Sequence, residues 1–305
     1  MANDPQVPWT DEQWSRVNQA IQEEAHRARV AATFLPLYGP LPPDADYVRQ
    51  QEISYPAAQA IVGRSQLNIN DRDTIRLATL QVMAPVRNAQ MADPELSSVL
   101  ALFRRAANVV ARLEDAVIFR GLAAGPINLG GSTPPAGIGG LPAIWQITGA
   151  LPARGLWTLG ARWWVPVPAA PANQRGHAIV AAVSQAIGLL ERNGHFGPFA
   201  VTLGQGLFLV AQTPDVGSLV MPQDRIMPFL GGGPLLRTST LDALGGNSGV
   251  VVALGGAPVE LVVATDMHLQ FVQVTTDPVF VFRVSEKIAL RIREPEAIVQ
   301  LFMQL

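Results

Sequence analysis

The sequence predicts an α+β fold, because apolar residues recur at helical spacing in the first two thirds of the chain and short β-branched runs fill the last third. The 305-residue chain is 49% hydrophobic, which is enough for a large core or for a core with extensive subunit contacts. Its length predicts roughly two domains.

The first helix is predicted to begin after Thr10. Thr10 is a good N-cap, and Gln13 completes a capping box with it. Trp9 precedes the cap and Trp14 occupies the fourth helical position, so the two indoles can form a hydrophobic staple.

Two non-helical segments follow. The prolines of Phe34–Tyr47 exclude a regular helix and predict an extended strap over the surface. Between Gln59 and Val86 the pattern is strand-like, and Asn68–Asp73 supplies turn residues between two arms. A two-stranded arm is marginal alone, so we expect it to lie on something else.

The second helix is predicted from Asp93, as N-cap, with Pro94 at its first position, to about Phe119. It spans about 25 residues, or roughly 37 Å, which is long for a globular domain. Its apolar stripe comprises Leu96, Val99, Leu100, Phe103, Ala107, Val110, Leu113 and Val117.

The segment Gly121–Gly160 is rich in glycine and proline but also contains tryptophan, which favours an ordered layer of loops over disorder. A third helix is predicted over Gln174–Arg192, stopped by Asn193-Gly194. Strands are then expected at Gly197–Gly204, Val250–Ala253, Val259–Thr265, His268–Thr275, Val279–Val284 and Ile288–Arg293.

Composition excludes several classes of function. A net charge of −2 gives no footprint for nucleic acid. The chain has no cysteine, and its four histidines lie in unrelated contexts, so no metal site is expected. The N-terminus lacks a signal-peptide pattern, and the most apolar segment, Gly249–Met267, is broken by Pro258 and Glu260, which predicts strands and no membrane span. We expect a soluble cytoplasmic protein.

Two stretches resemble catalytic or cofactor-binding motifs, but both are incomplete. Ser248 lies in a Gly-x-Ser-Gly stretch (Gly245–Val250) similar to that of trypsin-like hydrolases, but no histidine has the matching context, and a serine without a base is not activated. A turn between strands is the better reading. The stretch Gly137–Pro142 does not complete a dinucleotide loop. We expect no catalytic residue, no cofactor and no enzyme.

Two adjacent acids, Glu114 and Asp115, lie near the end of the second helix. They differ by about 100° around a helix, so they cannot converge on one substrate. Negative charge at a helix C-terminus is unfavourable by about 0.3–1 kcal/mol per residue, which calls for a compensating cation. Arg112 and Arg120 lie nearby. We therefore expect one of the acids to pair with an arginine at a subunit or domain junction.

Four stretches resemble the encapsulins, the shell proteins of bacterial nanocompartments that were once described as linocin-type bacteriocins. In chain order they are TDEQWSRVNQAIQEEA, LEDAVIFRG, NGHFGPFAVTLG and REPEAIVQL. Their order and spacing cover nearly the whole chain.

The resemblance implies a Hong Kong 97 phage-like major capsid fold. Its domains would be an N-terminal helix and strap of the P-domain (1–47), an E-loop (48–86), a P-domain spine helix (87–124), an A-domain (125–237) and C-terminal P-domain strands (238–305). An icosahedral shell built from copies of this chain would enclose a cargo enzyme, such as a dye-decolorising peroxidase or a ferritin-like protein. A phage or prophage capsid protein of the same fold is the alternative.

The resemblance also implies two kinds of site. Pores at the symmetry axes would admit small solutes, with Thr213, Pro214, Asp215, Val216, Gly217 and Ser218 near the five-fold pore. A C-terminal targeting peptide of the cargo would dock in a groove between the N-terminal helix and the P-domain. The expected lining residues, for which plain core packing is the alternative, are Val17, Ile21, Ala25, Ile288, Leu290 and Ile298.

Overall fold

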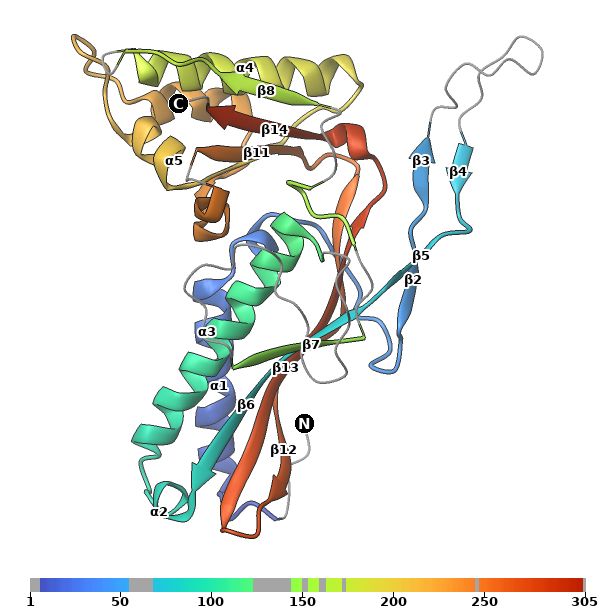
Figure 1. The fold of residues 1–305 in the computed structure, drawn as a ribbon, viewed down its shortest axis with the longest axis vertical. Coiled ribbons are helices and arrows are strands. Elements are labelled where there is room, and N and C mark those ends of the chain that lie inside the picture. Colours follow the sequence, from blue (N-terminus) through green and yellow to red (C-terminus); the bar gives the residue numbers. More distant parts are fainter. Residues whose placement is uncertain are drawn as a thin grey trace.

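The computed structural model describes residues 6–54, 68–122, 144–149, 153–158, 163–171, 174–244 and 247–303. Two helix-and-sheet bodies are stacked along the longest axis of the molecule, and paired strands project from its side (Figure 1). This is the α+β architecture that the sequence predicts. Most of the glycine- and proline-rich segment 121–160 lies outside the described residues.

The first body is a sheet covered on one face by two helices (Figure 1). Its described strands run in the order β1 (Leu37–Tyr38), β12 (Val259–Val274), β13 (Val279–Ile292), β6 (Ala78–Arg87) and β7 (Trp145–Thr148). The sequence predicts four short strands where β12 and β13 are continuous. Register shifts between Val263 and Gln273 interrupt the alternation along β12 without ending the strand.

The covering helices are α1 (Asp11–Ala28) and α3 (Ser97–Arg120), with the short α2 (Asn88–Met91) before α3 and a 3-10 turn η1 (Ala31–Thr33) after α1. The predicted capping box of Thr10 and Gln13 is present. The staple is present too, because the rings of Trp9 and Trp14 meet edge to face at 5.1 Å. Trp9 also stacks on Phe282 of β13 at 5.0 Å, so the staple ties the start of α1 to the sheet.

Helix α3 begins later than predicted. Leu96 has a left-handed conformation (φ 52°), so regular helix starts only at Ser97. The Asp93 side chain accepts hydrogen bonds from the backbone N–H groups of Glu95 and Ser97, each at 3.0 Å, and so caps a turn that precedes the helix. The helix is 24 residues long, or roughly 36 Å.

The second body contains the sheet β10 (Leu235–Arg237), β9 (Phe199–Leu203), β11 (Ser248–Ala253), β14 (Ile298–Met303) and β8 (Trp164–Val167). Its helices are α4 (Arg175–Arg192), α5 (Gln205–Gln212) and α6 (Pro222–Ile226). Short 3-10 turns lie at η2 (Met227–Leu230), η3 (Ser239–Leu244) and η4 (Pro295–Ala297). The α4 bounds differ by one residue from the prediction, and Gly194 (φ 87°) follows its end.

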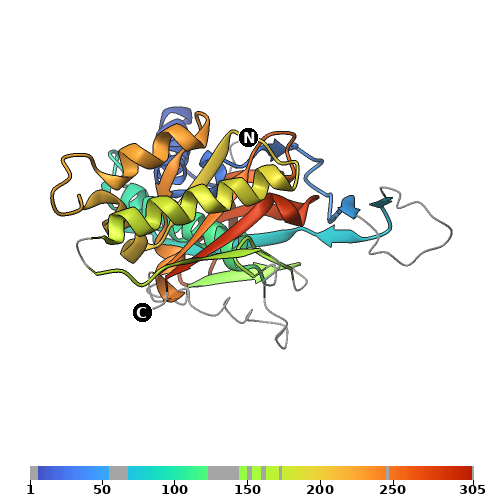
Figure 2. The same cartoon turned by 90° about the horizontal axis from the view of Figure 1, so that it is seen from above.

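The projecting strands, here called the arms, are β2 (Tyr47–Arg49) paired with β5 (Thr74–Arg76) and β3 (Glu52–Ser54) paired with β4 (Asn68–Asn70). The predicted turn at Asn68–Asp73 is wrong in part, because Asn68–Asn70 is itself a paired strand. The connection between β3 and β4 lies outside the described residues. Figure 2 shows the arms extending well beyond the body of the molecule.

Two predicted domain boundaries do not follow the sheets. Strand β7 falls within 125–237 but pairs with β6 in the first sheet. Strands β11 and β14 fall within 238–305 but pair with each other and with β9 and β8 in the second. The C-terminal third therefore ties the two bodies together, which is a long-range property that local patterns do not encode.

Candidate functional site

The two acids that drew attention in the sequence lie at the meeting point of α1, α3 and the first sheet. Glu114 is fully buried, and its Oε2 forms an ion pair with Nε of Arg29 at 2.6 Å. The Arg29 guanidinium also contacts Glu286 at 2.6 Å and Asp266 at 2.9 Å. An arginine therefore does pair with Glu114, but it is the C-cap residue of α1 and not the predicted Arg112 or Arg120.

Asp115 is held by backbone groups instead. Its carboxylate accepts hydrogen bonds from the N–H groups of Val30, at 3.1 Å, and Ala31, at 2.8 Å, at the start of η1. Both acids thus contact consecutive residues just after α1, although they point in different directions from α3. We call Arg29, Glu114, Asp115, Asp266 and Glu286 the junction cluster.

The junction cluster holds more carboxyl groups than cations, which shifts their proton affinities. Burial raises the pKa of Glu114 to about 7 and that of Asp115 to about 7. Burial, with the nearby charge of Glu114, raises the pKa of Glu286 well above its ordinary value. Burial opposes the charge of Arg29, but the surrounding carboxylates outweigh it and raise the pKa of its guanidinium.

Arg29 forms ion pairs with Glu114 of α3 and with Glu286 of β13. The cluster therefore fixes the end of α1 against α3 and β13 through one guanidinium.

The C-terminal end of α3 is completed by a segment that follows much later in the chain. The carbonyls of Ile118 and Phe119 accept hydrogen bonds from the N–H groups of Leu156, at 2.9 Å, and Trp157, at 2.7 Å. These are carbonyls that a helix end leaves without partners of its own. Arg120 closes the helix, and burial lowers the pKa of its guanidinium. Arg112 lies half-buried on the same helix.

A cavity of about 660 Å³ opens beside the junction cluster, between the end of α1 and the strap that carries β1. We call it the acidic cavity. Glu114, Asp266 and Glu286 line it together with Arg29 and His26, and Leu37, which is 66% exposed, also lines it. The cavity therefore combines apolar walls with three carboxyl groups and the arginine that pairs with them.

The six residues predicted to line a cargo groove lie elsewhere. All are at most 6% exposed and belong to one hydrophobic core. The apolar face of α1 packs on α3 and β12, and among the six only Leu290 lines one of the two cavities described in this section. Core packing, the alternative weighed from the sequence, therefore accounts for Val17, Ile21, Ala25, Ile288, Leu290 and Ile298.

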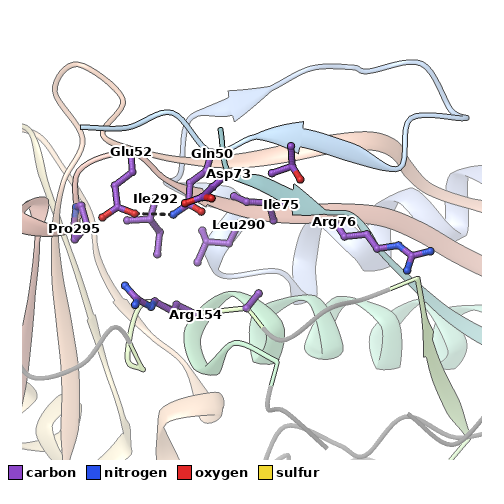
Figure 3. A pocket seen from close by; sticks show the side chains of 11 residues that line it. Gln50, Glu52, Asp73, Ile75, Arg76, Arg154, Leu290, Ile292 and Pro295 are labelled. Atoms are coloured by element: carbon purple, nitrogen blue, oxygen red, sulfur yellow. Dashed lines mark hydrogen bonds between the residues drawn. The ribbon is translucent and has the colours of Figure 1, made fainter. Parts of the chain in front are cut away.

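A second cavity, of about 310 Å³, lies at the base of the arms (Figure 3). Gln50, Glu52 and Asp73 line its arm side, and the Gln50 amide donates a hydrogen bond to Glu52 at 2.9 Å. Arg154 lies on the opposite wall in Figure 3. The lining mixes both signs of charge without focusing them on one point.

The predicted pore residues form the loop between α5 and α6. Asp215 Oδ1 accepts a hydrogen bond from the N–H of Gly176 at 2.9 Å, in the first turn of α4. The Thr213 hydroxyl donates to the carbonyl of Leu209 at 2.8 Å. Val216 is 83% exposed at the tip.

The catalytic alternative finds no support in the geometry. Ser248 is fully buried, and its hydroxyl donates to the carbonyl of Leu241 at 3.1 Å. It begins β11, so the predicted turn is wrong at this residue. Within the described part of the chain, no group of three or more His, Asp or Glu is arranged to hold a metal ion, and no helix is long and apolar enough to span a membrane.

Comparisons with known proteins agree with one another. The sequence matches the family model Linocin_M18, described as encapsulating protein for peroxidase, over residues 2–130 and 151–289. It is 26% identical over 301 residues to the type 1 encapsulin shell protein EncA of Myxococcus xanthus, covering 95% of this chain and 92% of that protein.

Solved structures share the fold at lower identity. A virus-like particle from Pyrococcus furiosus matches with a TM-score of 0.62 and 16% identity, over 95% of this chain and 99% of that one. The capsid of Myoviridae phage XM1 matches with a TM-score of 0.54 and 13% identity, over 86% and 87%. Gordonia phage Cozz matches with a TM-score of 0.57 and 12% identity, over 90% and 86%.

Proposed function

Because the chain belongs to the Linocin_M18 family of encapsulin shell proteins, we propose that it assembles into a closed icosahedral shell that encloses a cargo enzyme. Its fold is that of the Hong Kong 97-type phage capsid proteins. In this proposal the first body is the P-domain with α3 as spine helix, the second body is the A-domain, and the arms belong to the E-loop.

The observation that carries the proposal is the family match along most of the chain. The arms support it, because isolated two-stranded ribbons are marginal in water and gain stability when a neighbouring subunit supports them. Weak contacts of this kind, repeated by closed symmetry, sum to a stable particle.

Electron microscopy of the purified protein tests assembly. We expect closed particles of tens of nanometres by negative stain (order of magnitude for shells of ~33 kDa subunits) and elution at high mass on size exclusion. Elution as a monomer or dimer, without particles, would contradict the proposal. Particles filled with genomic nucleic acid in place of an enzyme would instead favour a phage-type capsid protein.

We place the docking site for the cargo's C-terminal peptide at the acidic cavity. It lies where α1 meets the sheet, its apolar walls fit aliphatic side chains, and its three carboxyl groups outnumber its one arginine, which favours a basic residue of the peptide. Strand β1 pairs with β12 on one side only among the described residues, so its other edge is open to an extended peptide.

Substituting Leu37 tests this placement. Leu37→Asp puts a carboxylate on the exposed wall of the cavity, so we expect intact shells whose ratio of copurified cargo to shell falls at least fivefold, or about 1 kcal/mol. The ratio is measured by mass spectrometry of shells from the native host. Val272→Asp, an exposed position on β12, is the matched control and should retain cargo. A cargo-to-shell ratio in Leu37→Asp equal to that in Val272→Asp and in the wild type would exclude the cavity as the docking site.

A further inference from the structure

Two buried acids behind the acidic cavity are only partly compensated by Arg29. Glu114 and Glu286 both line the cavity, and their side chains are 0% and 1% exposed. Arg29 contacts Oε2 of Glu114 and Oε1 of Glu286. Among the described residues, the other oxygen of each carboxyl group has no hydrogen-bond partner. A buried carboxylate with an unpaired oxygen is costly, so both groups favour the protonated form until a positive charge comes near.

Asp266 is the carboxylate that a ligand in the cavity can reach. Its side chain is 59% exposed, and its Oδ1 accepts a hydrogen bond from the Arg29 guanidinium at 2.9 Å. That guanidinium therefore bridges the accessible carboxylate and the two buried ones. When the buried pair is neutral, the charges of Arg29 and Asp266 balance. When it is ionised, the same wall is negative, so two inaccessible groups set the potential that a ligand meets.

The remaining titratable groups around the buried pair lie on three elements. His26 of α1 and Tyr38 of the strap line the cavity, and Asp115 follows Glu114 on α3. The carboxylate of Asp115 is occupied by two backbone N–H groups after α1. His26 gains a positive charge when it is protonated, so at low pH it opposes a bound cation in the same direction as the buried pair.

On the basis of the docking site proposed above, we propose that a basic side chain of the cargo peptide docks beside Asp266 and drives protons off Glu114 and Glu286, so that cargo docking is coupled to proton release. The raised pKa values of both buried carboxyls bring this exchange near neutral pH. Ionised carboxyls attract the cation and neutral ones do not. The affinity is therefore lower at pH 6 than at pH 8.

A small cation and its uncharged analogue test the exchange in assembled shells. The probes are isopentylguanidinium, which joins an apolar body to a cation, and isopentylurea, which has nearly the same shape. Saturation-transfer NMR, which suits weak ligands of very large particles, measures both dissociation constants at pH 6 and pH 8. We expect the guanidinium to bind at least about fivefold more tightly at pH 8, and the urea to change by less than about twofold. Guanidinium binding that is equal at both pH values, or absent at both, would overturn the proposal.

Two substitutions identify the groups that respond to pH. Glu286→Gln keeps the shape of the side chain but cannot ionise, so the preference of the guanidinium for pH 8 should fall below about twofold. His26→Gln removes the imidazole that lines the cavity, and a preference of at least about threefold should remain. A preference that is unchanged in Glu286→Gln, or lost in His26→Gln, would assign the pH dependence to another group and overturn the proposal.

Failure of the docking site is distinguishable from failure of the proton coupling. If Leu37→Asp shells retain their cargo, the cavity is not the docking site. If they lose it while the guanidinium binds equally at pH 6 and pH 8, docking at the cavity stands and the coupling to protons is wrong. Electron microscopy of each variant verifies that shells have formed before the probes are added.

Discussion

Arg29 is the residue on which the packing of α1 against α3 and the first sheet depends. Its guanidinium contacts two buried carboxyls, Glu114 and Glu286, and the more exposed Asp266. A lone buried carboxylate is strongly destabilising, so removing the cation leaves a large penalty. The main effect of removing Arg29 is therefore the free-energy cost of the unpaired buried carboxylates that remain, and not the loss of each ion pair itself.

Arg29→Gln should therefore destabilise the subunit by about 3–5 kcal/mol at pH 8. At pH 5 the loss should be smaller, because the buried carboxyls are then largely protonated and need no cation. Arg16→Gln is the control, since Arg16 pairs with Glu95, the two side chains are 38% and 73% exposed, and such an exposed pair is worth about 0–1 kcal/mol. Urea unfolding followed by tryptophan fluorescence measures both variants. An equal loss at both pH values would contradict the account.

The raised pKa values of Glu114 and Asp115, about 7 each, give the stability of the subunit a defined pH dependence. Because these pKa values lie above those of the unfolded chain, the stabilisation is fully present below the unfolded values of about 4 and is lost as pH rises through 7. We expect the free energy of unfolding to fall between pH 5 and pH 8.

Glu286→Gln should flatten that fall, because it removes one buried carboxyl while its amide oxygen can still accept from Arg29. Asp46→Asn is the control: Asp46 is exposed, its hydrogen bond to Lys287 lowers its pKa, and its loss should leave the slope between pH 5 and pH 8 unchanged. Urea midpoints at several pH values provide the measurement. A slope in Glu286→Gln as steep as in the wild type would show that the cluster does not set the pH dependence.

Local signals predicted some elements well. Helices α1 and α4 are bounded by caps and stops that act within a few residues, such as the Thr10 capping box and Asn193-Gly194. The pairing of Glu114 with Arg29 escaped prediction because the partners are far apart in sequence. One signal was available: Glu286 is an acid within an apolar strand pattern, which indicates a buried partner.

Other elements depend on contacts that no local pattern contains. Strand β7 joins the first sheet, and β11 and β14 join the second, through pairings between distant segments. The six expected groove residues were chosen for their apolar spacing, which is equally typical of a core face, and the core is where they lie. Spacing predicts that a face is buried but not what buries it.

At the scale of elements, the joint between α3 and residues 153–158 leaves no space for a side chain. A Cβ at Gly155 would collide with the backbone of Phe119, Arg120 and Gly121. Gly155→Ala should therefore lower stability by about 1–3 kcal/mol, because the backbone must shift and strain the hydrogen bonds to the end of α3.

Gly188→Ala is the matched substitution for this test. Gly188 lies within α4 with open space around its Cβ position, so alanine should raise stability by roughly 0.5–1 kcal/mol. Thermal melting of the two variants gives opposite signs if the joint is as tight as described. An unchanged melting temperature for Gly155→Ala would show that the backbone at this joint can move to accommodate a methyl group at little cost in stability.

At the scale of the whole molecule, the outer part of the arms lies outside the core of the subunit, so a change there should affect assembly more than folding. Their strands pair only with each other among the described residues. Their base is joined to the first body by the packing of Val48 and Ile75 against residues of β12 and β13, and Ile53 donates a hydrogen bond to the Arg293 carbonyl at 2.7 Å. The subunit core does not include Ile69 on β4, whose side chain is 56% exposed. Exposed apolar surface on a projecting pair of strands indicates a contact with another subunit, because it adds nothing to the core of its own subunit.

Ile69→Asp should therefore leave the free energy of unfolding of the subunit within about 0.5 kcal/mol of the wild-type value. The yield of particles should nevertheless fall sharply. The charge would be buried without a partner wherever the arm meets a neighbouring copy, which raises the free energy of every such contact in the shell. Size exclusion and negative-stain microscopy measure the yield, and Ile69→Val, which keeps an apolar side chain, should assemble normally. Normal particles from Ile69→Asp would show that β4 lies outside the contacts between subunits and that other surfaces of the chain drive assembly.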